Sequence, residues 1–125
     1  MNAAAADNGA PLLSVRDLSV VHSRRGTSIP LQAVRSASFD LANGEIFALV
    51  GESGSGKSSL AHTILQLHRA AAGTIDFRGS RLGQGRGRSR STRRHIQAVF
   101  QDPLASLSPR RTIGQSLLEP LHHFK

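Results

Sequence analysis

A run of nine residues, GESGSGKSS at 51–59, constrains the fold of this chain more than any other feature. It directly follows the apolar run IFALV at 46–50, in which apolar and polar residues do not alternate. Such a run is typical of a strand buried on both faces of a parallel sheet. After the glycines, residues 60–68 place their apolar side chains on one helical face. The sequence therefore predicts a buried strand, a glycine-rich turn and a helix, an order found in α/β folds.

The turn itself matches the phosphate-binding pattern G-x-x-x-x-G-K-[ST] at every fixed position of 51–58. Its glycines let successive backbone N–H groups turn inward, and those donors form an anion site with the start of the following helix. Lys57 is expected to reach the β- and γ-phosphate oxygens, and the Ser58 hydroxyl to bind Mg²⁺. The residues predicted to bind the nucleotide in this segment are Gly51, Glu52, Ser53, Gly54, Ser55, Gly56, Lys57, Ser58 and Ser59. A flexible glycine–serine turn is the alternative, but such a turn requires neither the lysine nor the serine that follows it.

Other segments carry the patterns of further elements. We expect residues 1–10 to be a disordered tail and residues 113–124 to be a helix interrupted by Pro120. Four segments have the composition or alternation of strands: LLSVRDLSVV (12–21), LQAVRSASFDL (31–41), TIDFRG (74–79) and HIQAVF (95–100).

Composition excludes several classes of protein. The chain has no cysteine, so disulfides and thiolate metal sites are ruled out. It starts without a secretory signal, and no run approaches the roughly 18 apolar residues of a membrane span. These features predict a cytosolic chain.

The net charge of +8 comes from the second half of the chain. Residues 78–95 hold seven arginines and four glycines, a composition that predicts a solvated basic loop or a poorly formed helix. A nucleic-acid-binding surface is the alternative reading of this cluster. No aromatic residue interleaves the arginines to provide a stacking platform, which disfavours nucleic acid as a partner.

Two longer segments, FDLANGEIFALVGESGSGKSSLA (39–61) and VFQDPLASLSPRRTIGQSLLEPL (99–121), resemble the ATP-binding subunit of ABC transporters. The resemblance is to the importer group for oligopeptides, dipeptides and nickel, and it runs from about Leu12 to about Phe124. It implies a P-loop NTPase of the α/β class, with an antiparallel β subdomain and an incomplete parallel core sheet. Residues 11–125 are accordingly expected to form the first part of an ABC nucleotide-binding domain, ending after the Q-loop region.

The resemblance assigns roles to two residues outside the glycine loop. Gln101, which lies 44 positions after Lys57, corresponds to the glutamine that begins the Q-loop. It is therefore expected to bind Mg²⁺, to act in catalysis together with Lys57, and to precede residues that contact the membrane subunits. His22 stands where the family places an aromatic residue on adenine, although an imidazole offers less area than tyrosine. A surface turn glutamine and a surface histidine are the alternatives for these two residues.

As implied by the resemblance, the cofactors are ATP and Mg²⁺. The partners are a second ATP-binding subunit, transmembrane permease subunits and, indirectly, a solute-binding protein. The location is the cytoplasmic face of the cell membrane, and the function is import of oligopeptides, dipeptides or a related solute.

Hydrolysis in this family needs a carboxylate to organise Mg²⁺ and another to activate water. After Ser58 the acidic residues are Asp76, Asp102 and Glu119, and none of them follows a run of four apolar residues. The sequence also lacks an LSGGQ-like signature and a placeable switch histidine. We therefore expect an incomplete domain and make no prediction that it hydrolyses ATP. A catalytically inactive fragment is the alternative.

Overall fold

The computed structural model describes residues 10–23, 30–83, 90–102 and 107–123. Its chain divides into two compact units, 1–86 and 87–125, which are described separately below. The predicted tail lies outside the described residues except for its last position.

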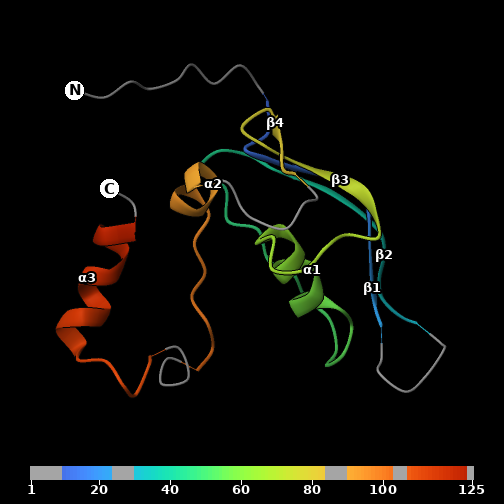
Figure 1. The fold of residues 1–125 in the computed structure, drawn as a ribbon. Coiled ribbons are helices and arrows are strands. Elements are labelled where there is room, and N and C mark those ends of the chain that lie inside the picture. The colour runs from blue at the N-terminus through green and yellow to red at the C-terminus, as the bar shows by residue number, and fades with distance from the viewer. Residues whose placement is uncertain (1–9, 24–29, 84–89, 103–106, 124–125) are drawn as a thin grey trace. The chain divides into compact units, whose positions relative to one another are not determined.

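The first unit is built on a four-stranded antiparallel sheet (Figure 1). Its strands are β1 (Leu13–His22), β2 (Leu31–Leu41), β3 (Ala72–Phe77) and β4 (Ser80–Arg81), in the spatial order β2-β1-β3-β4. The central strand β1 pairs Val15 with Phe39 on β2 and with Ile75 on β3. The three longer strands match the predicted segments, and their antiparallel pairing confirms the predicted β subdomain.

A paired irregularity interrupts β1 and β2. Asp17 and Ser36 both adopt a φ of 48°, and the β1–β2 register shifts on either side of Leu18. The Ser36 hydroxyl donates to the Asp17 carboxylate at 3.0 Å, and the Asp17 N–H donates to the Ser38 hydroxyl at 2.8 Å. Because of this bulge, the fully buried residues of β1 are Val15, Leu18 and Val20 and do not alternate regularly.

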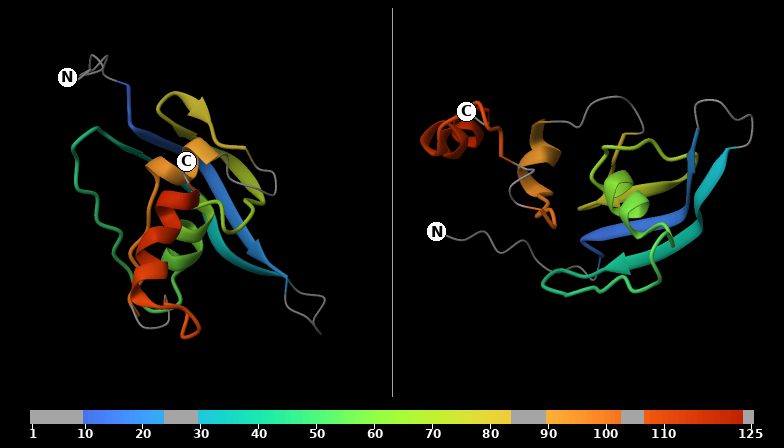
Figure 2. Two further views of the ribbon diagram at one scale, coloured as in Figure 1. Left: turned by 60° about the vertical axis from the view of Figure 1, so that its left-hand side comes forward. Right: turned by 90° about the horizontal axis from the view of Figure 1, so that it is seen from below.

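Helix α1 (Lys57–Ile64) lies against one face of this sheet (Figure 2). Leu60 and Thr63 are its buried residues, and the Thr63 hydroxyl donates to the Ser59 carbonyl at 2.7 Å. The apolar core of the unit consists of Leu13, Val15, Leu18, Val20, Val34, Leu60, Leu65, Ile75 and Leu82. The sheet and this core hold the start of α1, and with it the glycine loop, in place.

The strand predicted for 46–50 is not found. Residues 46–50 form no strand, and Ile46 and Val50 are 97% and 90% exposed. A parallel strand is buried only when neighbouring strands and covering helices flank it, and no strand within the described ranges pairs with this segment. One of its contacts is the ring of Phe47, which stacks on Phe39 with centroids 4.9 Å apart. The parallel core sheet is therefore not formed by the described residues.

The second unit contains α2 (Arg90–His95) and α3 (Ile113–His123). Helix α3 lies where a helix was predicted, but it continues through Pro120 and is not interrupted there. It begins with a reciprocal cap in which Gln115 N–H donates to Thr112 Oγ1 and Thr112 N–H donates to Gln115 Oε1. The strand predicted for 95–100 is wrong, because His95 ends α2 and residues 96–100 form no strand. Of the basic segment, 84–89 lies outside the described residues and 90–95 is helical.

None of the helices in the described part of the chain combines the length and the apolar character that crossing a bilayer requires.

Candidate functional site

The glycine loop is anchored to the sheet through Gly56. This residue caps α1 with a φ of 92°, in the left-handed region that L side chains rarely adopt. A Cβ atom at this position would lie 2.1 Å from the carbonyl oxygen of Ala33 and 3.3 Å from the side chain of Val34, both on β2. Glycine is thus required at position 56 both by backbone conformation and by the close approach of β2.

The side chain of Lys57 turns back into the loop that precedes it. Its Nζ donates to the carbonyl oxygens of Gly51 at 2.7 Å and Glu52 at 2.6 Å, and to the Ser55 hydroxyl at 3.2 Å. The Ser55 N–H closes the turn by donating to the Glu52 carbonyl at 3.2 Å. The ammonium group therefore lies among the residues that the motif assigns to the phosphates, and its three hydrogen bonds are exposed. A phosphate that binds here would replace the loop oxygens as acceptor of the hydrogen bonds that the Lys57 ammonium group donates.

The start of α1 is available to an anion. No side chain caps its first N–H groups, and no acidic residue lies in its first turn. Helix N-termini carry unsatisfied donors and a partial positive charge, which together favour phosphate or carboxylate groups. Ser58 is exposed in this first turn, next to Lys57. Lys57, Ser58 and the loop backbone, which were predicted from the motif, are thus brought together.

A hydroxyl beside phosphate oxygens suits Mg²⁺, which prefers oxygen ligands, keeps several waters and uses few protein groups in nucleotide sites. Ser58 fits such a role. Among the described residues, no group of three or more His, Cys, Asp or Glu side chains could hold a metal ion by itself.

His22, at the end of β1, lies beside the start of α1. Its Nε2 is 2.9 Å from the Ser59 hydroxyl in a partly buried hydrogen bond. Its ring meets His68 edge-on, with centroids 5.2 Å apart, and His68 lies 5.3 Å from His62. Partial burial, followed by the nearby charges of His22 and His62, lowers the pKa of His68. We call His22, His62 and His68 the histidine cluster; the predicted contact between His22 and adenine remains a prediction.

Sequence patterns did not indicate this cluster. Its members come from β1, from α1 and from the segment after α1, and their spacing along the chain matches no ligand motif. The folding of α1 onto the sheet brings them together, so a linear pattern carries no signal for it.

Gln101 belongs to the second unit, where it is exposed in a bend that follows residues 96–100. The glycine loop belongs to the first unit. The role predicted for Gln101 in binding Mg²⁺ and in catalysis therefore remains a prediction.

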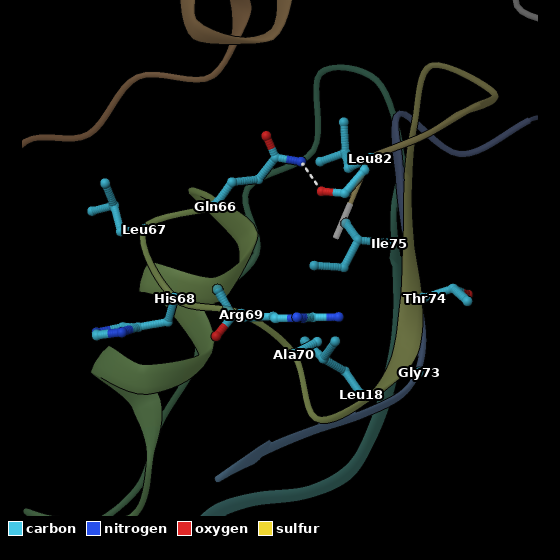
Figure 3. A pocket seen from close by; sticks show the side chains of 12 residues that line it. Leu18, Gln66, Leu67, His68, Arg69, Ala70, Gly73, Thr74, Ile75 and Leu82 are labelled. Carbon is cyan, nitrogen blue, oxygen red and sulfur yellow. Dashed lines mark hydrogen bonds between the residues drawn. The ribbon is translucent and has the colours of Figure 1, made fainter. Parts of the chain in front are cut away.

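A separate cavity of about 380 Å³ lies between the segment after α1 and strand β3 (Figure 3). It contains no residue of the glycine loop. Gln66 spans it, donating from Nε2 to the Gly83 carbonyl at 3.1 Å. Figure 3 shows the Arg69 side chain extending toward β3, whereas the His68 ring points the opposite way. The cavity is lined by Leu18, Thr63, Gln66, Leu67, His68, Arg69, Ala70, Gly73, Thr74, Ile75, Leu82 and Gly83.

Comparison with known proteins gives consistent matches. The family model described as "ABC transporter" matches residues 34–123. A Brucella ovis protein named "Putative peptide import ATP-binding protein" is 47% identical over 113 residues, which cover 90% of this chain and 35% of that protein. The Escherichia coli K12 protein named "Glutathione import ATP-binding protein GsiA" is 44% identical over 120 residues, which cover 91% of this chain and 19% of that protein. The chain thus spans about a third or less of the length of these relatives.

Proposed function

The chain belongs to the ABC transporter family, and we propose that its loop at 51–58 binds the phosphates of MgATP as part of an importer's ATP-binding subunit. The observation that carries the proposal is the arrangement around Gly56 and Lys57. The loop is pressed against β2 at a position only glycine can occupy, and its lysine is held inside the turn. The uncapped start of α1 supports the same reading.

Each part of the loop has a defined task in this proposal. Backbone N–H groups of 51–58 hold the phosphate oxygens, and Lys57 neutralises charge on the β- and γ-phosphates. Ser58 contributes one oxygen to the Mg²⁺ that accompanies the nucleotide. These groups bind and orient; none of them takes a proton from water at neutral pH. Gln101 is proposed to add a further Mg²⁺ ligand and to link the nucleotide to the membrane subunits.

The solute proposed for the transporter is a peptide or a related compound. This rests on the names of the relatives, which describe import of peptide and of glutathione. The proposed partners are a second ATP-binding subunit, with which two ATP molecules are sandwiched, and transmembrane permease subunits that receive a solute-binding protein. The proposed location is peripheral, on the cytoplasmic face of the membrane.

Isothermal titration with MgATP tests the phosphate site. Lys57→Ala removes charge-assisted hydrogen bonds worth about 1.5–3 kcal/mol, so ATP affinity should fall by roughly tenfold to a hundredfold. The other lysine of the chain supplies the matched control, Lys125→Ala, which should bind ATP like the unchanged protein. Equal ATP affinity in Lys57→Ala and Lys125→Ala would overturn the assignment.

The arginine-rich segment at 78–95 suggests nucleic-acid binding as a second candidate function, which can be tested. If the chain binds nucleic acid, it should shift a DNA or RNA probe at about 150 mM salt with a steep salt dependence. Replacing Arg86, Arg88 and Arg90 by serine should then flatten that dependence. We expect instead that the triple variant leaves ATP affinity nearly unchanged and that the unchanged protein gives no such shift.

A further inference from the structure

The histidine cluster contains His22, the residue predicted to contact the base of the nucleotide. Ser59 Oγ lies 2.9 Å from Nε2 of His22, and the edge of His68 meets the same ring at a centroid distance of 5.2 Å and an interplanar angle of 79°. The His22 ring is therefore constrained both by a hydrogen bond and by a ring contact.

We propose that His68 is a positioning residue for the base side of the nucleotide site, acting by holding the His22 ring in a fixed plane. The proposal rests on the proposed function and on the prediction that His22 contacts adenine. His68 itself need not touch the nucleotide. Its ring contact adds to the restraint that the Ser59 hydrogen bond places on Nε2 of His22.

The backbone places His68 for this role. After α1, Gln66 adopts a φ of 56° and the chain folds back on the helix end. The His62 carbonyl then accepts hydrogen bonds from the N–H groups of Leu67 at 2.8 Å and His68 at 3.2 Å. Gln66 also ties this segment to Gly83, beyond β4. In the close view the His68 ring lies on the side away from Arg69 and β3 (Figure 3).

His62 supports His68 in turn. The two rings lie 5.3 Å apart with an interplanar angle of 46°. Partial burial and the charges of His22 and His62 lower the pKa of His68, which favours the neutral form of its ring. A neutral ring can meet His22 edge-on without the repulsion that two imidazolium groups would exert.

Fixing the ring in advance matters because an imidazole offers little area to a base. Immobilising a free side chain on binding lowers affinity by about two- to tenfold, a loss that pre-organisation avoids. Losing the His68 contact should therefore weaken only the part of binding that depends on the base.

The test compares two ligands, MgATP and magnesium tripolyphosphate, which has the phosphate chain but no base. His68→Ala should weaken ATP binding about two- to tenfold and leave tripolyphosphate binding unchanged. His68→Phe keeps an aromatic edge and should restore ATP affinity. Equal losses for both ligands would mean that His68 only supports the fold, and no loss for ATP would mean that it holds nothing; either result overturns the proposal.

The same titrations separate this proposal from the proposed function. Lys57→Ala should weaken the binding of both ligands. If the unchanged protein binds neither ligand, the proposed phosphate site fails. If it binds both with equal affinity, the phosphate site stands and the base-side role of His22 and His68 is overturned.

A measurement without nucleotide gives an independent check. In imidazole NMR spectra, His68→Ala should shift the side-chain signals of His22, because the neighbouring ring is lost. His122→Ala, on α3 in the second unit, is the matched control and should leave those signals in place. Unmoved His22 signals in His68→Ala would refute the positioning role whatever the nucleotide titrations give.

Discussion

Replacing Gly56 by alanine should destabilise the first unit more than any other single-methyl addition in the glycine loop. The new Cβ would lie 2.1 Å from the Ala33 carbonyl oxygen, and this atom belongs to the backbone of β2, which cannot rotate away. The residue would also keep a φ of 92°. A left-handed conformation costs an L-residue roughly 1–2 kcal/mol, and relieving an overpacked contact costs about 1–3 kcal/mol.

These two terms add to about 2–5 kcal/mol, a large share of the roughly 5–15 kcal/mol that holds a typical domain together. Gly54→Ala is the matched control. Gly54 has a φ of 81°, but a Cβ built there meets nothing within 4 Å. It therefore carries the conformational cost of about 1–2 kcal/mol without the clash.

Urea unfolding followed by circular dichroism measures both variants against the unchanged protein. We expect Gly56→Ala to lose about 1–3 kcal/mol more than Gly54→Ala, which is the overpacking term alone. Equal losses in the two variants would refute the reasoning, because they would mean that β2 does not press against the loop at Gly56.

Because the pKa of His68 is lowered in the fold, the unfolded chain binds more protons below about pH 6.5. The contribution of His68 to the free energy of unfolding should therefore be fully present above that pH and be lost as the pH falls through the folded-state pKa. His68→Gln should flatten the dependence of the melting temperature on pH over this range. Gln101→Ala should impair transport coupling more than ATP binding when both are measured in membrane vesicles with the permease subunits, whereas equal impairment would indicate a general defect around Gln101. Leu18→Ala, at a fully buried position of β1, should cost about 2–5 kcal/mol, whereas Ile46→Ala, at a position 97% exposed, should stay within about 0.5 kcal/mol in urea unfolding; a large loss at Ile46 would contradict its exposure.

The sequence by itself determined the local features of the site. A helix after the glycine-rich turn was predicted, and α1 begins at Lys57, directly after Gly56, because glycine tolerates the left-handed cap. The helix ends at Ile64, so the last part of the helical pattern expected at 60–68 lies outside it. Strand β2 at Leu31–Leu41 coincides with the predicted segment, because its alternation is a property of neighbouring residues. The match of residues 51–58 to the phosphate-binding pattern is likewise a property of neighbouring residues.

Only the tertiary structure decided the features that depend on distant partners. The burial expected for 46–50 is a property of flanking strands, and none of the described strands pairs with that segment, so an apolar run was mistaken for a buried strand. The bulge that joins Asp17 to Ser36 arises from two strands in register. The contact of Gly56 with Ala33 and the bond of His22 with Ser59 join residues that are 23 and 37 positions apart. Periodicity reports which face of an element is apolar; which residues meet across that face is set by how α1 packs on the sheet.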